Sequence, residues 1–156
     1  MIIRAMTPAD VPAVATIEAA LQYHPWNAAQ FLESLQSQHP SWVVDVNGEI
    51  CGFAVAMQVL DEATLLEVGI APAHQGKGWG KLLVQEVIDA ASESGMAVMH
   101  LEVRIANKVA RQLYKRLGFQ EVGKRRGYYR APITEATPDG REDAILMALT
   151  LDEGAR

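Results

Sequence analysis

The sequence predicts a single α/β domain on a mixed sheet, with seven strands and four helices along the chain. Apolar residues recur at helical spacing before residue 42 and alternate as in strands after it. Asn47-Gly48 joins two of these strand segments with the strongest short signal for a β-hairpin. A glycine-rich turn at residues 75–81 separates a strand segment from an amphipathic helix segment. Because 156 residues suffice for one hydrophobic core, we assign residues 1–156 to one domain.

The first part of the chain predicts one strand and two helices. The segment 2–5 is short and rich in branched residues, as strands are. Thr7 can cap the first helix with Pro8 at its first position, and Asn27 can cap the second, which Pro40 ends. Apolar residues at helical spacing define the inward faces of the two helices: Val11, Val14, Ile17, Ala20 and Leu21 in the first, Phe31, Leu32 and Leu35 in the second.

Three strands follow. Segments 42–46 and 50–57 form the hairpin, and a second turn at 61–62 leads into a strand at 64–70. Gly69 lies inside this third strand, where a glycine indicates a β-bulge or the close approach of another part of the chain.

The next two elements are a helix over 82–92, which Gly95 can end, and a strand over 98–104. The inward face of the helix holds Leu83, Val84, Val87, Ile88 and Ala91. Alternation along the strand places Met99, Leu101 and Val103 on one face and His100, Glu102 and Arg104 on the other.

The last part predicts a helix capped by Asn107 and ended by Gly118, then strands over 119–129 and 144–151. The inward residues of this helix are Val109, Ala110, Leu113 and Leu117. Two prolines and a Pro-Asp-Gly turn indicate a mobile loop over 130–141.

Composition excludes several function classes. A net charge of −5 argues against broad nucleic-acid binding. Cys51 is the single cysteine, so no internal disulfide forms, and its place in a strand indicates a buried, inert thiol. The sequence shows neither a signal peptide nor an apolar run long enough to span a membrane, so we expect a cytoplasmic protein. No group of His, Cys and acidic residues has metal-ligand spacing, so we expect no metal.

The glycine-rich turn, Gln75-Gly76-Lys77-Gly78-Trp79-Gly80-Lys81, would present unpaired backbone N–H groups at a helix start, which suits a phosphate. Gln75 and Leu82 exclude a Walker A loop, because that motif needs glycine and a hydroxyl residue at those positions. Lys81 and Leu83 exclude a dinucleotide fingerprint, which needs a small residue at one of them. Taken alone, the turn is either a phosphate loop of another type or a plain glycine turn.

The remaining pattern, Gln-x-x-Gly-x-Gly, resembles the acyl-CoA pyrophosphate loop of the GNAT acetyltransferases. The resemblance continues through 101–104, Asn107, 113–114 and 117–119 in family order. Further motifs narrow it to the RimI-type ribosomal-protein-alanine N-acetyltransferases: His24-Pro25-Trp26, Asp61-Glu62-Ala63-Thr64, Arg125-Arg126-x-Tyr128-Tyr129 and Gly140-Arg141-Glu142-Asp143-Ala144. It implies the GNAT fold, whose sheet is mostly antiparallel, and acetyl-CoA as acetyl donor. The implied acceptor and partner is the N-terminal alanine of a small-subunit ribosomal protein.

The resemblance also implies site residues. Glu102 takes the place of the general base and Tyr114 that of the general acid. From the residues alone, Glu102 could instead pair with a cation such as Arg104, and Tyr114 could be a core tyrosine. Glu67 departs from the RimI-type pattern, which tends to place a neutral polar residue there. Since many other GNAT enzymes place a base on this strand, Glu67 could share that role or be a solvated or supporting residue.

Residues expected to bind acetyl-CoA are Val68, Gly69, Ile70, Gln75, Gly76, Lys77, Gly78, Trp79, Gly80, Lys81 and Asn107. Residues expected to bind the acceptor are Trp26, Glu67, Tyr128 and Tyr129, although the two tyrosines could equally pack on neighbouring strands. The loop 130–141 is longer than in enterobacterial relatives and borders the acceptor entrance in GNAT folds. Two other functions stay open: a GNAT enzyme acting on lysine or small amines, and a non-catalytic acyl-CoA-binding module.

Overall fold

The computed structural model describes residues 1–151, and within them seven strands form one sheet in the order β1-β2-β3-β4-β5-β7-β6. Neighbouring strands are antiparallel except for the parallel pair β4/β5, so the sheet is mixed and mostly antiparallel, as expected. The strands are β1 Ile2–Ala5, β2 Ser41–Val46, β3 Glu49–Val59, β4 Glu62–Ile70, β5 Val98–Arg104, β6 Gln120–Arg130 and β7 Arg141–Thr150.

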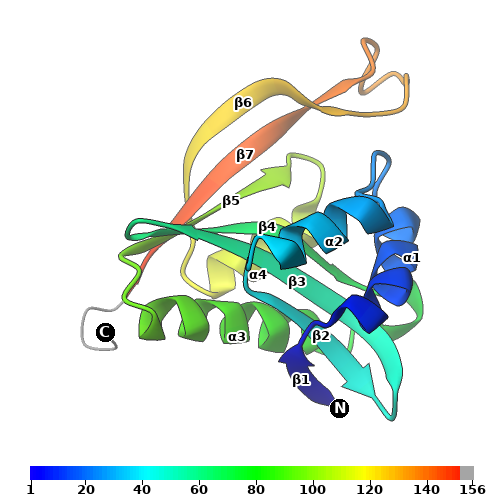
Figure 1. Ribbon diagram of the computed structural model, residues 1–156. Coiled ribbons are helices and arrows are strands. Elements are labelled where there is room, and N and C mark those ends of the chain that lie inside the picture. Colours follow the sequence, from blue (N-terminus) through cyan, green and yellow to red (C-terminus); the bar gives the residue numbers. More distant parts are fainter. Residues whose placement is uncertain (152–156) are drawn as a thin grey trace.

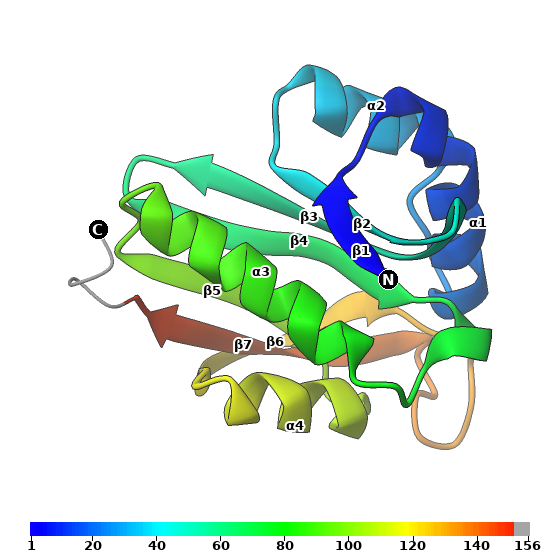
Figure 2. The same cartoon turned by 90° about the horizontal axis from the view of Figure 1, so that it is seen from below.

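Helices cover both faces of the sheet. Figure 2 shows α3 and α4 side by side on one face, while α1 and α2 lie on the other. The strands β6 and β7 continue beyond the helices as a curved arm (Figure 1). The helices are α1 Val11–Leu21, α2 Ala28–Gln36, α3 Trp79–Glu93 and α4 Lys108–Arg116. None of the helices described here is long and apolar enough to cross a membrane.

Several predicted boundaries differ from the structure. Residues Pro8–Asp10 form a 3₁₀ turn, and the α-helix starts at Val11. Helix α2 ends before Pro40, because Gln38 adopts a left-handed conformation with φ of 61°. The turn between β3 and β4 lies at 60–61 instead of 61–62, with Leu60 at φ 55°.

Helix α3 starts earlier than predicted. It begins at Trp79, so the last part of the glycine-rich turn forms the first helical turn. Three predicted inward residues also prove exposed, since Ala20 on α1, Leu32 on α2 and Val109 on α4 face solvent. These three errors have one cause: helical spacing defines the buried face of a helix only to within one residue on each side.

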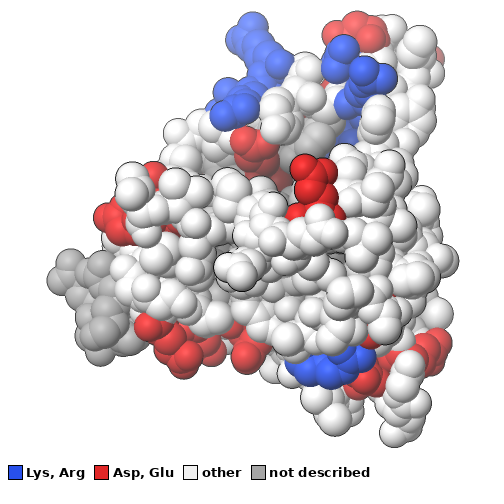
Figure 3. Space-filling view, viewed as in Figure 1, with Lys and Arg blue, Asp and Glu red and all other residues white. Residues whose placement is uncertain are grey.

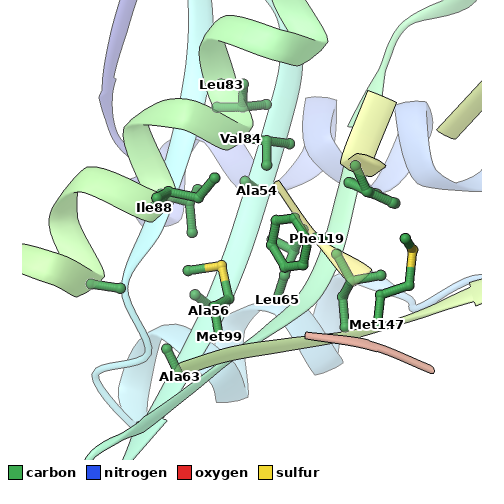
Figure 4. Close-up of a cluster of buried hydrophobic side chains, with 14 of the residues drawn as sticks. Ala54, Ala56, Ala63, Leu65, Leu83, Val84, Ile88, Met99, Phe119 and Met147 are labelled. Atoms are coloured by element: carbon green, nitrogen blue, oxygen red, sulfur yellow. The ribbon is translucent and has the colours of Figure 1, made fainter. Parts of the chain in front are cut away.

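The core has two parts, one on each face of the sheet. Between the sheet and helices α3 and α4, Leu83, Val84 and Ile88 pack on residues of the central strands (Figure 4). On the opposite face, α1 and α2 bury Val14 and Phe31 against β2 and β3. Each face of the central sheet is therefore dry, and polar groups buried there need partners.

A β-bulge in β4 sets the direction of the residues after it. Leu65 pairs with Ala56 and Glu67 pairs with Val55, so Leu66 is an extra residue in β4. Ala56 belongs to the core under α3, whereas Val55 belongs to the core under α1. The bulge therefore turns Glu67 toward α1, although strict alternation from Leu65 would place it on the α3 face.

Gly69 is not the bulged residue, which corrects one of the two sequence interpretations. It pairs regularly with Phe53. A Cβ at this position would lie 2.6 Å from Leu21 Cδ1 and 3.0 Å from Phe53 Cε1. The second interpretation is confirmed, because glycine here permits α1 to approach β4 closely.

Candidate active site

A cavity of about 610 Å³ opens where β4 and β5 separate. Their parallel register runs from Glu62 opposite Val98 to Leu65 opposite Leu101 and stops there. Figure 3 shows the surface hollowed between the β6–β7 arm and the α1–α2 side, with basic residues on the upper rim and acidic residues inside. The lining comes from both faces of the sheet: Leu21, Gln22, His24, Leu65, Leu66, Glu67, Val68, Leu101, Glu102, Val103, Arg104, Asn107, Tyr114, Tyr128, Tyr129, Arg130 and Arg141.

The edge of β4 that faces this gap offers free backbone groups. The Ala71 N–H donates to the Cys51 carbonyl at 2.8 Å, so Ala71 and, by alternation, Gly69 direct their polar groups toward β3. Val68 and Ile70 then direct theirs toward the gap, where the Ile70 carbonyl accepts from Gln75. Of the three residues predicted to bind the pantetheine arm through their backbone, two direct backbone groups into the gap, whereas Gly69 is the position at which α1 packs closely on β4.

The glycine-rich turn forms an anion-binding start to α3. Gly76 and Gly78 have φ of 80° and 83°, a left-handed conformation that glycine adopts without strain. The first helical hydrogen bond runs from Leu82 N–H to the Gly78 carbonyl. The amides of 79–81 therefore have no acceptor within the helix and lie at the positive end of its dipole.

Side chains of the turn have separate tasks. Gln75 Nε2 donates to the Ile70 carbonyl at 3.0 Å, which joins the turn to the end of β4. Trp79 packs on the core and stacks on His74, with ring centroids 5.4 Å apart. Lys77 Nζ lies 4.9 Å from the centre of the Trp79 ring, so its positive charge stays beside the turn. Gln75 and Trp79 thus shape the turn, while Lys77 adds charge to it.

Close to this turn, Glu49, Cys51 and His74 bring potential metal-ligand atoms within 4.8 Å of one another. Sequence spacing did not reveal this group, because β3 and the segment before α3 contribute to it separately. Lys77 Nζ lies 3.3 Å from His74 Nδ1. An ammonium group at that distance opposes a bound cation.

Glu102 projects from β5 into the cavity. Its carboxyl group lies 3.6 Å from Arg125 on β6. Hydrogen bonding to Glu102 is also the main reason why the pKa of Tyr128 is raised. The predicted alternative, pairing with a cation, is therefore confirmed, but the cation is Arg125 and not Arg104. Arg104 binds Glu142 at 3.2 Å and lies 4.4 Å from the centre of the Tyr129 ring.

Tyr114 reaches the same cavity from the opposite face of the sheet. It is 6% exposed and packs edge-on against Phe119, with centroids 5.8 Å apart. Burial, with a smaller contribution from the negative charge of Glu67, raises the pKa of Tyr114 to about 12. Its ring belongs to the core while the residue lines the cavity, so the two sequence interpretations of Tyr114 are compatible.

Glu67 lies beside Glu18 of α1, a residue that sequence analysis passed over. Glu18 is 1% exposed, and its Oε2 accepts a hydrogen bond from Trp26 N–H at 3.1 Å. Burial, followed by repulsion from Glu18, raises the pKa of Glu67 to about 9. The signal was present in the sequence, since Glu18 stands on the apolar face of α1 between Val14 and Leu21.

Tyr128 and Tyr129 enter the cavity through an irregularity in β6. The register of β6 against β7 shifts first between Glu121 and Gly123, and a second time between Arg125 and Tyr129. Gly127 between them has φ of 58°, and its N–H donates to Asp143 Oδ1 at 2.9 Å. The two rings meet edge-on at 5.0 Å, and burial raises the pKa of Tyr129 well above its usual value.

Two further predicted residues lie in different places. Asn107 caps α4 by accepting from Ala110 N–H at 3.2 Å, and it lines the cavity. Trp26 does not line the cavity; its ring packs edge-on against Phe31 at 5.2 Å. His24 lines the cavity instead, from the segment that joins α1 to α2.

The loop between β6 and β7 is closed by a hydrogen bond from Ala131 N–H to the Gly140 carbonyl, and Arg130 and Arg141 at its ends line the cavity.

Known proteins resemble the chain over nearly its whole length. A family model described as the acetyltransferase (GNAT) family matches residues 11–119. A [ribosomal protein bS18]-alanine N-acetyltransferase from Escherichia coli is 38% identical over 149 residues, which are 96% of this chain and 97% of that protein. The crystal structure of the ribosomal-protein-alanine N-acetyltransferase from Escherichia coli superposes with a TM-score of 0.87, at 37% identity and covering 97% and 94% of the two chains. A Salmonella typhimurium protein solved with its cofactor acetyl-CoA superposes with a TM-score of 0.81, at 26% identity and 98% and 95% coverage.

Proposed function

The chain belongs to the acetyltransferase (GNAT) family, and we propose that it transfers the acetyl group of acetyl-CoA to the N-terminal α-amine of a protein. The acceptor we propose is the N-terminal alanine of ribosomal protein bS18, which the similar Escherichia coli enzyme modifies according to its name. The observation that best supports this function is the cavity at the β4/β5 gap, because residues from both faces of the sheet meet there.

The two faces suit the two substrates. The turn before α3 does not line the cavity, but the hydrogen bond from Gln75 to the Ile70 carbonyl joins it to the end of β4. Backbone amides of the turn and of the β4 edge can therefore hold the pyrophosphate and pantetheine of acetyl-CoA. The acidic and aromatic side chains of β4, β5 and β6 line the cavity, where an extended peptide N-terminus can enter. The amine then meets the thioester within the gap.

The reaction needs a base because only a neutral amine attacks the thioester carbonyl. An α-amine has a pKa of about 8 and a lysine amine about 10.4, so neutralising the α-amine costs about 3 kcal/mol less. We assign the base to Glu102, which accepts the amine proton directly or through a water chain. Glu67 is unsuited to this task at neutral pH, because its pKa of about 9 keeps it protonated.

Tyr114 is the proposed acid for the departing thiolate. With a pKa of about 12 it remains protonated at every working pH. Full proton transfer to a free thiolate, whose pKa is about 8.5, would be uphill by roughly 5 kcal/mol. We therefore assign Tyr114 to a hydrogen bond that stabilises negative charge on sulfur as the carbon–sulfur bond breaks, and the released thiolate takes its proton from water.

An acceptor assay tests the proposal. The protein is incubated with acetyl-CoA and peptides that begin Ala-Arg, Ser or Met, together with a peptide whose N-terminus is blocked and whose lysine is free. We expect acetylation of the α-amine, fastest for the Ala-Arg peptide, as located by mass spectrometry. Acetylation of the blocked peptide alone would show a lysine acetyltransferase. Tight binding of CoA without any turnover would show an acyl-CoA-binding module.

A further inference from the structure

Helix α1 and strand β4 bring two carboxyl groups together beside the cavity. Glu18 and Leu21 are one turn apart on α1 and so lie on the same face of the helix. Glu67 and Gly69 are two residues apart on β4, on the face toward α1. Leu21 contacts the Gly69 position so closely that a Cβ there would lie 2.6 Å from it. Glu18 lies one helical turn before Leu21 on α1, just as Glu67 lies two residues before Gly69 on β4. Glu18 is therefore placed beside Glu67.

Glu18 has an unmet hydrogen-bonding need at this place. Its Oε2 accepts from Trp26 N–H, but its Oε1 is buried and has no donor among the residues that the structure describes. Two ionised carboxylates cannot hydrogen-bond to each other, because both only accept. A proton on the Glu67 carboxyl group supplies the missing donor.

We propose that Glu18 and Glu67 share one proton, and that Glu18 thereby holds Glu67 as a neutral carboxyl group in the acceptor side of the cavity. Glu18 is a positioning residue in this arrangement, since it acts through Glu67 and does not line the cavity. The role in acetyl transfer rests on the proposed function, whereas the shared proton itself does not. The direction of the shifts agrees: burial raises the pKa of both carboxyl groups.

Other charged and titratable groups face Glu67 from the surrounding elements. Arg104 of β5 is the cation that lowers the pKa of Glu67, but its contribution is smaller than those of burial and Glu18. Glu102 of β5, Tyr114 of α4, Tyr129 of β6 and His24 line the same cavity. The negative form of Glu67 raises the pKa of both tyrosines. A negative charge at Glu67, in addition to that of Glu18, would therefore raise the pKa of Tyr114, the group assigned to the departing thiolate.

A neutral Glu67 also protects the acceptor amine. An opposite charge within about 4–6 Å shifts a pKa by about one to three units toward the charged form. An ionised Glu67 would stabilise the ammonium form of the acceptor and reduce the fraction of reactive neutral amine. The protonated carboxyl group keeps a carbonyl oxygen that can accept a hydrogen bond from the peptide without adding this charge.

The first test measures the proton directly, with no acetyltransferase activity involved. Carboxyl carbons are labelled in glutamate and their NMR shifts are followed from pH 4 to 10 in wild type, Glu67→Gln and the control Glu86→Gln, which alters an exposed residue of α3. We expect one resonance to titrate near pH 9 in wild type and in the control, and to be lost in Glu67→Gln. Titration of every glutamate below pH 6 would overturn the proposal.

The second test uses the acetyl-transfer rate and separates the two proposals. Glu67→Gln keeps a neutral donor toward Glu18 and a carbonyl oxygen toward the peptide, so its loss of kcat/KM at pH 7.5 should be smaller than the loss in Glu18→Gln. Glu18→Gln removes the neighbouring negative charge and offers an amide donor to Glu67, which lowers the pKa of Glu67 and favours its ionised form. We expect kcat/KM to fall by up to about tenfold, as for one unit of amine pKa. The double variant should recover most of this loss.

Each outcome has a distinct meaning. Recovery in the double variant supports the shared proton, since a merely structural loss at Glu18 would persist or grow. If Glu67→Gln abolishes turnover as fully as Glu102→Gln does, Glu67 acts as a base and the inference is wrong. If wild type acetylates no peptide at all, the proposed function fails, and the NMR titration still decides whether the pair shares a proton.

Discussion

Glu102 and Glu67 line the same cavity in different surroundings. Glu102 stands near Arg125 and the hydroxyl group of Tyr128, whereas Glu67 is buried against Glu18. Burial and like charge both favour the protonated form of a carboxyl group, so the surroundings of Glu67 suit it for keeping a proton. The Glu102 side chain lines the cavity and is 29% exposed, so an amine or a water molecule can reach it.

Replacing Glu102 by glutamine tests the base. We expect kcat/KM to fall about 10²–10⁴-fold, the range typical of a lost general base. The loss should be larger at pH 6.5 than at pH 9, because an α-amine with a pKa of about 8 is mostly protonated at the lower pH. Binding of acetyl-CoA, measured by calorimetry, should be nearly unchanged.

The matched control for this variant is Glu62→Gln, since Glu62 hydrogen-bonds His100 outside the cavity. It should retain wild-type turnover. A loss that is equal at both pH values would contradict the base assignment, as would a larger loss in Glu67→Gln.

Replacing Tyr114 by phenylalanine tests the acid. The ring that packs against Phe119 is kept and only the hydroxyl group is removed, so the melting temperature should change little. We expect kcat to fall at least about 10²-fold, because the thiolate loses its donor. A single-turnover measurement with acetyl-CoA isolates the chemical step, and a rate within twofold of wild type would exclude this role.

At the scale of elements, the turn before α3 and the separation of β4 from β5 shape the donor side of the site. Gly76 and Gly78 hold the turn in a left-handed conformation. The first backbone amides of the helix that starts at Trp79 are directed toward this turn. The local sequence largely encodes this element, because glycines and a helix start act within a few residues of one another.

The variant Gly78→Ala tests this turn, with Gly48→Ala in the β2/β3 hairpin as its match. Both glycines have positive φ, 83° and 88°, and a Cβ would meet no atom within 4 Å at either place. Each substitution should therefore cost about 1–2 kcal/mol of stability through backbone strain. Only Gly78→Ala should also weaken acetyl-CoA binding, by about tenfold or roughly 1.4 kcal/mol, because the amides move. Equal binding by the two variants would count against the anion cradle.

At the scale of the whole molecule, the buried carboxyl group of Asp10 and the half-buried one of Glu67 link stability to pH in opposite directions. The guanidinium of Arg4 lowers the pKa of Asp10 to about 2. Asp10 thus stabilises the fold above its unfolded pKa of about 3.9 and loses this effect as the pH falls through 2. Glu67 has a raised pKa of about 9, so the folded state holds a proton that the unfolded chain releases above about pH 4.5.

The free energy of unfolding should consequently fall as the pH rises from 5 to 9, by up to about 1.4 kcal/mol per unit for the one extra proton. Urea unfolding at pH 5 and pH 8 measures this slope. In Glu67→Gln the slope should flatten, so the variant gains stability relative to wild type at pH 8. Parallel slopes for the two proteins would show that the folded state does not hold the proton.

The sequence by itself determined the elements, their order and the caps of two helices, because these depend on neighbours within a few positions. The strand Val98–Arg104, its alternation and the caps at Asn27 and Asn107 all match the prediction. Its motifs also pointed to the family that the comparisons confirm.

The tertiary structure decided which side chains meet. The bulge at Leu66 turns Glu67 toward α1, Arg125 rather than Arg104 approaches Glu102, and Trp26 lies outside the cavity while His24 lines it. Strand register, a bulge and the docking of a helix set these contacts between residues distant in the chain. A shift of one residue in strand register turns a side chain to the other face of the sheet, and the local sequence pattern does not specify that shift.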